Sequence, residues 1–205
     1  MDKFEVLLRG FLQAPEDDAM GEVLEGVAQQ TNRWGELIQA ANEAVQEAEG
    51  ARKVTLCLAL ARWYSLLDHP EYSQPYLQLA LEREPEASRV RRAIAAVLRR
   101  TGDHQHTGEE LTRALHLARE DAERVDILCD LGDLLTHDMG QPEQGDPFYR
   151  RALEVNPSSE RARRALGLGA KGSGVPAESP SSPPGEPAPP EARQPFDSVP
   201  PWAKG

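Results

Sequence analysis

Two histidines are the residues best placed for metal chemistry. His104 and His106 lie two positions apart in the sequence Asp103-His104-Gln105-His106. Imidazole nitrogens are common metal ligands, but a zinc site needs three or four protein ligands, and the sequence indicates no third one here. We therefore expect this segment to be a solvated loop and predict no metal site.

The two cysteines could form a disulfide or act as nucleophiles. Cys57 and Cys129 are far apart in the chain, and each lies on the apolar face of a predicted helix. A buried free thiol is the ordinary state of such a cysteine. The low cysteine count favours a reducing compartment, so we expect a cytoplasmic protein.

No catalytic motif accompanies these residues. The other histidines are His69, His116 and His137, and none of them belongs to a recognisable Ser/His/Asp or Cys/His motif. The sequence also lacks a phosphate-binding loop and a dinucleotide-binding fingerprint. We expect no catalytic residues and no cofactor, which predicts a non-enzymatic protein.

Arginines form the remaining chemical pattern. Arg89, Arg92 and Arg99 have the spacing of one helical face. One interpretation is a solvated face whose arginines pair with nearby glutamates. The other is a binding surface, because a guanidinium group can hold a carboxylate of a partner through two hydrogen bonds.

The elements that must position these residues are two predicted helices within residues 54–87. A turn at Pro70 separates the helices, and Pro85 closes the second one. Small or apolar residues mark the contact face of the pair. They are Cys57, Leu60, Ala61, Tyr64, Ser73, Leu77 and Ala80. Two helices can pack closely at Ala61, Ser73 and Ala80, because these side chains are short.

The same spacing recurs in residues 88–121 and 125–159, and more weakly in residues 18–51. The weak copy has Glu25 where a small residue is expected. The last copy carries one extra residue, which we expect in its turn. A fixed period near 34 residues is typical of a helical repeat array.

These marks resemble the tetratricopeptide repeat over residues 17–168. The matches to its pattern of small residues, aromatic residues and a closing proline are Tyr64, Ala80, Pro85, Gly132, Tyr149, Ala152 and Pro157. Its tryptophan at position 4 is absent, and Arg119 replaces one closing proline. The resemblance implies an all-α protein, an α-solenoid of antiparallel helix pairs in a right-handed superhelix, with about four repeats plus a capping helix.

In this family, four positions on the first helix of each repeat face a concave groove that binds partner peptides. The resemblance therefore implies a partner-binding groove containing Arg62, Ser65, Arg89, Arg92, Arg99, Asp126 and Asp133. Leu58 and Arg62 do not match the lysine and asparagine with which some family members bind chaperone tails. The arginines predict a partner protein with an extended acidic segment.

The two ends of the chain differ from the repeats. Residues 1–16 read as a partial repeat or capping helix, because several of their apolar residues fall on one helical face. Ser158 is expected to cap a final helix that reaches Leu168. Residues 169–205 hold ten of the 17 prolines, together with many Ser and Gly residues. Such a composition buries little apolar surface and predicts a disordered tail.

Composition narrows the class of partner. The net charge of -11 disfavours nucleic-acid binding, which depends on a basic surplus. No segment has the roughly 20 apolar residues of a membrane span. We expect a protein-protein interaction module, a scaffold or adaptor. The alternative is a regulatory or docking segment of a larger enzyme or kinase whose catalytic part lies outside this chain; a longer reading frame upstream of Met1 would favour it.

Overall fold

The computed structural model describes residues 2–168, and all regular elements in that range are helical. The prediction of an all-α chain is confirmed there, and the predicted tail lies outside the described residues. The elements are α1 (Lys3–Gln13), α2 (Asp18–Thr31), α3 (Trp34–Glu47), α4 (Gly50–Leu66), the 3-10 helix η1 (Pro70–Ser73), α5 (Gln74–Arg83), α6 (Ser88–Arg100), α7 (His104–Leu117), α8 (Asp121–Asp133), the π-helix η2 (Leu134–Asp138), α9 (Pro142–Val155) and α10 (Glu160–Ala165).

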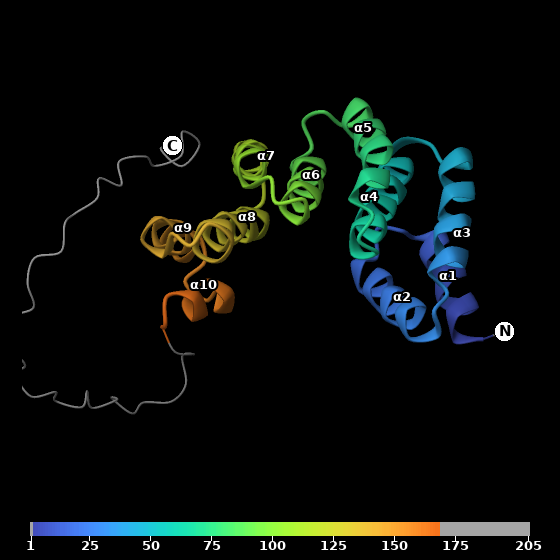
Figure 1. The fold of residues 1–205 in the computed structure, drawn as a ribbon, viewed down its shortest axis with the longest axis horizontal. Coiled ribbons are helices and arrows are strands. Elements are labelled where there is room, and N and C mark those ends of the chain that lie inside the picture. Colours follow the sequence, from blue (N-terminus) through green and yellow to red (C-terminus); the bar gives the residue numbers. More distant parts are fainter. Residues whose placement is uncertain (1, 169–205) are drawn as a thin grey trace, which may run out of the picture.

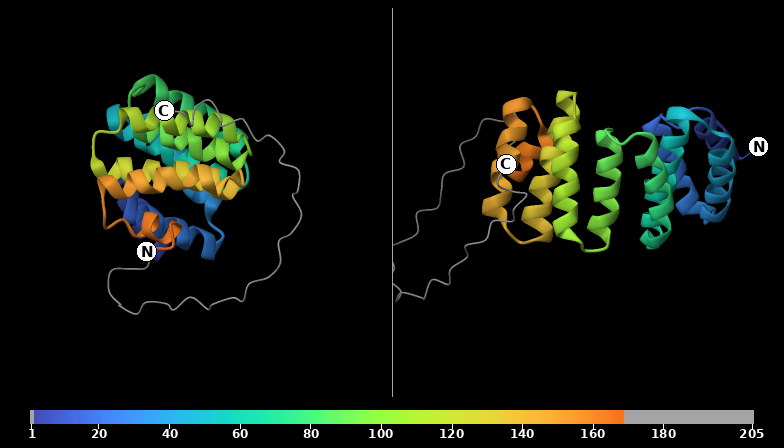
Figure 2. Two further views of the ribbon diagram at one scale, coloured as in Figure 1. Left: turned by 90° about the vertical axis from the view of Figure 1, so that its left-hand side faces the viewer. Right: turned by 90° about the horizontal axis from the view of Figure 1, so that it is seen from above.

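The helices lie side by side in an elongated array, with α1 to α3 at one end and α9 and α10 at the other (Figures 1 and 2). The most extensive contacts join neighbours in the sequence: α4 with α5, α6 with α7, and α8 with α9. These three pairs correspond to the three stronger copies of the sequence repeat. None of the helices in residues 2–168 is both long and apolar enough to cross a membrane.

The pair formed by α4 and α5 depends on small residues at its contact. Ala61, Ser73 and Ala80 are completely buried. The Ser73 hydroxyl donates a hydrogen bond to the Ala61 carbonyl oxygen at 2.7 Å, which ties η1 to α4. A larger side chain at any of these positions would separate the helices, because protein interiors are close-packed.

The hydrophobic core is divided into two clusters that meet at α6. The first cluster is built mainly by α1 to α5 and includes Val90 near the start of α6. The second begins at Ala95, one and a half turns later on the same helix, and continues through α7 to α10. Because α6 contributes to both clusters, it joins the two halves of the array.

The last pair accommodates its extra residue within a helix. We expected that residue in the turn, but the chain forms the π-helix η2, in which Met139 N–H donates to the Leu134 carbonyl at 3.0 Å. A π-helix holds one more residue per turn than the i to i−4 pattern, so the insertion is absorbed before the turn. Gly132 and Gly145 then allow close packing of α8 and η2 against α9.

The weak N-terminal copy departs from the other pairs. Asn32 takes a left-handed conformation with φ of 54° and ends α2. However, α2 contacts α1 more extensively than it contacts α3. Glu25 stands where a small residue would allow a close helix pair, and its side chain is directed to α4 instead.

One predicted helix cap is shifted by one residue, and a serine at the start of another helix does not cap it. Ser159, not Ser158, caps α10 by accepting a hydrogen bond from the Ala162 N–H. Ser88 is the first residue of α6 rather than its cap, and its hydroxyl donates to Glu123 instead. A serine hydroxyl can serve either role, so its position in the sequence alone does not fix which one it takes.

Candidate functional site

A groove of about 650 Å³ opens along α4, between α2 on one side and α6 on the other. Its floor is apolar and only partly covered by neighbouring side chains. The floor residues are Leu58, Ala59 and Leu66 of α4 and Ala93, Ala96 and Val97 of α6. The side chain of Leu66 is 44% exposed, which is unusual for a large apolar residue beside a core.

Helical spacing places these residues along the groove. On α6, Arg89, Ala93, Ala96 and Arg100 follow one another at intervals of four, three and four residues. Such residues form a single stripe on a helix. The alanines lie in the middle of the stripe, so α6 offers a shallow central surface with an arginine at each end.

The inner end of the groove is closed by aromatic side chains. Phe11 of α1 and Trp63 of α4 line it, with ring centroids 5.5 Å apart. Glu25 of α2 accepts a hydrogen bond from Trp63 Nε1 at 2.8 Å and another from Arg62 at 2.9 Å. One carboxylate therefore fixes the distance between the α2 wall and the α4 floor.

The two walls of the groove carry opposite charges. Glu16, just before α2, and Asp18 and Glu22 on α2 line the acidic wall, while the basic residues come from α4 and α6. The three acidic side chains are exposed, and none has an ion pair or hydrogen bond partner among the described residues. The negative charge of this wall is therefore not compensated within residues 2–168.

The predicted residues Arg62, Ser65 and Arg89 all line this groove. Arg89 pairs with both carboxylate oxygens of Glu84 at 2.8 Å and also donates to Thr55. With Arg62 bound to Glu25, both arginines are already neutralised by carboxylates of the same chain. This pairing corresponds to the first interpretation of the arginines.

Ser65 is 4% exposed, and its hydroxyl oxygen has no hydrogen-bond partner among the described residues. A helical serine commonly bonds the carbonyl four residues earlier, but the Ala61 carbonyl already accepts from Ser73. An unpaired buried hydroxyl is costly. Ser65 is thus a polar group at the groove that lacks a partner within residues 2–168.

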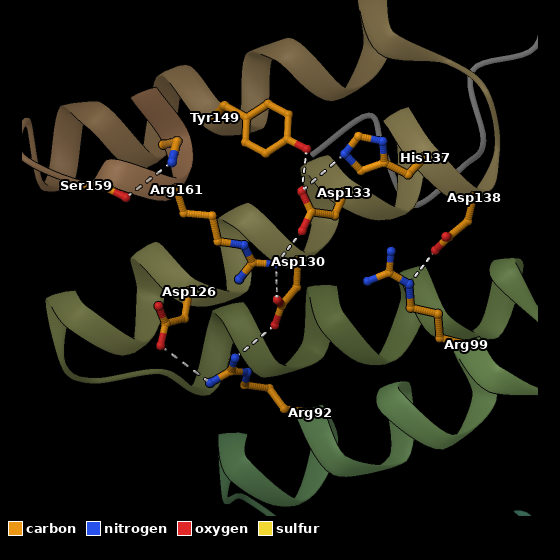
Figure 3. A network of polar contacts seen from close by, with 11 residues as sticks. Arg92, Arg99, Asp126, Asp130, Asp133, His137, Asp138, Tyr149, Ser159 and Arg161 are labelled. Atoms are coloured by element: carbon orange, nitrogen blue, oxygen red, sulfur yellow. Dashed lines mark hydrogen bonds and ion pairs between the residues drawn. The ribbon is translucent and has the colours of Figure 1, made fainter. Parts of the chain in front are cut away.

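The other predicted residues form a separate polar network in the second half of the array (Figure 3). Arg92 of α6 donates to Asp130 of α8 at 2.9 Å and lies 3.9 Å from Asp126. Arg161 of α10 bridges the same Asp130 and Asp133, with nitrogen–oxygen distances of 2.7 and 2.5 Å. The network joins α6, α8 and α10, so its charges are paired with one another within the array.

Two further contacts complete this network. The Tyr149 hydroxyl donates to Asp133 at 2.6 Å, and Arg99 forms an ion pair with Asp138 (Figure 3). Burial raises the pKa of Asp133, but the hydrogen bonds from Tyr149 and Arg161 outweigh it and lower the pKa overall. The structure therefore brings Arg92, Arg99 and Asp133 to one polar surface that does not line the apolar groove.

The residues considered for metal or thiol chemistry lie elsewhere. His104 and His106 are not in a loop as expected but in the first turn of α7, where Asp103 caps the helix and accepts from His106 N–H at 3.2 Å. Within residues 2–168, no group of three or more potential ligand side chains is close enough to hold a metal ion. Cys57 and Cys129 are free and buried, and burial raises the pKa of both thiols.

Sequence reasoning missed the acidic wall. The groove positions were carried over from the family pattern to the second and later copies only. Applied to the first copy, starting at Asp18, the fifth position would have been Glu22, which does line the groove. Glu16 precedes that copy, so the repeat pattern gave no signal for it.

Comparison of the sequence with protein-family models and with curated proteins finds no match.

Proposed function

We propose that this chain is a non-enzymatic protein-protein interaction module, a scaffold or adaptor, that holds a segment of a partner protein in the groove between α2, α4 and α6. The observation that carries this proposal is the partly exposed apolar floor around Leu58 and Leu66. Concave apolar surfaces flanked by charged side chains are typical of binding sites in proteins.

The arrangement of helices supports a tetratricopeptide-like solenoid as the scaffold for this groove. Successive pairs pack through small buried residues such as Ala61, Ala80 and Ala152, at the positions where that repeat uses them. In repeat proteins of this kind each unit contacts mainly its neighbours, which leaves an extended surface for partners. The groove lies on the first helices of three successive units, α2, α4 and α6.

A cytoplasmic location is part of the same proposal. Cys57 and Cys129 are both free thiols, one in each core cluster. Free buried cysteines are common in compartments that keep thiols reduced.

The proposal is tested by filling the groove without disturbing the core. Ala96 is exposed on the α6 stripe, so Ala96→Trp should occupy the central floor at a cost of only about 0.5 kcal/mol in helix propensity. Ala122→Trp is the matched control, because Ala122 is exposed on α8 and does not line the groove.

The full-length wild type and both variants are immobilised and exposed to a lysate of the cells that produce the protein. We expect proteins captured by the wild type and by Ala122→Trp to be lost from Ala96→Trp. Identical sets of captured proteins in all three samples would place the interaction surface outside this groove.

A further inference from the structure

From the charges of the groove we infer that its partner is an amphipathic α-helix with an apolar stripe and a row of lysine or arginine residues along the edge facing α2. This inference rests on the proposed function and names the chemistry of the partner. It differs from the extended acidic segment expected from the arginines alone.

The ion pairs already formed within the chain favour the basic helix over the extended acidic segment as the partner. Arg62 and Arg89 are held by Glu25 and Glu84 and would have to leave these carboxylates to bind an acidic partner; Arg100, at the end of the α6 stripe, has a longer contact of 3.9 Å with Asp68. Glu16 and Glu22 have no such partners among the described residues. A basic side chain arriving at the α2 wall gains ion pairs without breaking any, and the negative wall would also attract it from a distance.

The shape of the groove favours a helix. The α6 stripe from Arg89 to Arg100 covers twelve residues, and the eleven steps between its ends correspond to about 16.5 Å or three helical turns. Ala93 and Ala96 in its middle allow a second helix to approach closely, as small residues do in helix packing. A partner helix would then place large apolar residues against Leu58 and Leu66, at the i, i+3, i+4 and i+7 spacing of this mode of recognition.

Ser65 provides a second, independent indication that the groove holds a ligand. Its hydroxyl is buried at the floor and has no hydrogen-bond partner in the part of the chain that the structure describes. A hydroxyl oxygen can accept a hydrogen bond from an ammonium group. The same hydroxyl could donate to a carboxylate, so Ser65 indicates a polar ligand group, and the uncompensated acidic wall is what favours a lysine over an aspartate or glutamate.

The test uses the full chain and three labelled synthetic peptides of about 14 residues, stapled because isolated helices of this length are marginal in water. The first has a leucine stripe with lysines along one edge, and the second has glutamate in place of each lysine. The third contains the residues of the first in scrambled order. Affinities are measured by fluorescence anisotropy at low and high salt.

We expect the lysine peptide to bind more tightly than the other two and to lose affinity as salt rises. Glu16→Gln with Glu22→Gln should weaken it by about three- to tenfold, since each lost surface pair accounts for a modest free energy. Glu47→Gln with Glu86→Gln, two exposed carboxylates that do not line the groove, should leave the affinity unchanged.

Several outcomes would overturn the inference. They are a glutamate peptide that binds as tightly as the lysine peptide, a scrambled peptide that binds equally well, an unaffected Glu16→Gln and Glu22→Gln variant, or no saturable binding. The proposed function is judged separately with Ala96→Trp. If that variant still loses the proteins captured from the lysate, the groove is a docking site and only the chemistry assigned to its partner is wrong.

Discussion

Glu25 of α2 and Trp63 of α4 are joined by a hydrogen bond in which the indole Nε1 donates to the carboxylate at 2.8 Å. Trp63 is 1% exposed, so its N–H group has no access to water. The contact replaces the close helix pair that a small residue at position 25 would have allowed. It also fixes the α2 wall of the groove relative to its floor.

The first prediction concerns this contact. Glu25→Ala should lower the free energy of unfolding by about 1–3 kcal/mol, because it leaves the buried Trp63 N–H without an acceptor. Glu25→Gln keeps an amide oxygen for the indole and should cost less. Urea denaturation measures the free energy of unfolding of both variants. Equal losses for the two variants would mean that the charge of Glu25, and not its hydrogen bond to Trp63, stabilises the fold.

The helix pairs could be predicted from the sequence because their contacts depend on small residues at fixed intervals. Ala61, Ser73 and Ala80 are buried where the repeat pattern placed them. The π-helix and the position of α2 could not be predicted in the same way. They depend on how neighbouring helices accommodate one extra residue in the last copy and Glu25 in the first, where the repeat pattern has a small residue. This accommodation is a property of the packed structure.

The candidate site was predictable only in part. The resemblance to the repeat family implied one shared surface for Arg62, Ser65 and Arg89, and these three residues line the groove between α2, α4 and α6. The resemblance could not tell which charges are compensated. Arg89 is held by Glu84, five residues earlier, but Arg92 is held by Asp130, 38 residues later, and such a distant contact has no local signature.

A second prediction compares a closely packed glycine, Gly145, with a glycine that has open space around it, Gly26. A Cβ atom added at Gly145 would meet Thr136 and lie 2.8 Å from the Gly132 carbonyl oxygen. Gly145→Ala should therefore separate η2 from α9 and destabilise the protein by about 1–3 kcal/mol. Thermal unfolding followed by circular dichroism would measure this loss.

Gly26→Ala is the matched control. Gly26 lies within α2, and a Cβ atom there would have nothing within 4 Å. The substitution should raise stability by about 0.5–1 kcal/mol, because alanine loses less conformational freedom in a helix. If Gly145→Ala were as stabilising as Gly26→Ala, the close packing of α9 described above would be wrong.

A third prediction concerns acid. The pKa of Asp133 in the folded protein is lowered from its ordinary value of 3.8, so its ionised form stabilises the fold. That contribution is fully present above the unfolded value and is lost as the pH falls through the lower folded value. Asp133→Asn should therefore be less stable than the wild type at neutral pH, and the difference should narrow below pH 3.8.

Asp126→Asn serves as the control for this measurement, because Asp126 is exposed and its nearest ion-pair partner lies 3.9 Å away. Its stability difference from the wild type should be small at every pH. Urea denaturation at neutral and acid pH gives all the required free energies. A difference for Asp133→Asn that stays constant with pH would show that its ionisation does not contribute to folding.

The last prediction tests whether the arginines of α6 act within the fold. Arg99 and Asp138 form an ion pair whose side chains are 31% and 24% exposed, and it ties α6 to η2. A double-mutant cycle of Arg99→Ala and Asp138→Ala should give a coupling energy of about 1 kcal/mol or more, since partly buried pairs are less screened by solvent. The same cycle on Arg150 and Asp146, which lie 3.9 Å apart with exposures of 71% and 43%, should give a value near zero.

If the Arg99 cycle also gave zero, the pair of Arg99 and Asp138 would contribute nothing to folding, and the guanidinium group of Arg99 would be available to a carboxylate of a partner. A clear coupling would instead mean that a partner must compete with Asp138, which favours the open groove beside α2 as the place where an added charge binds.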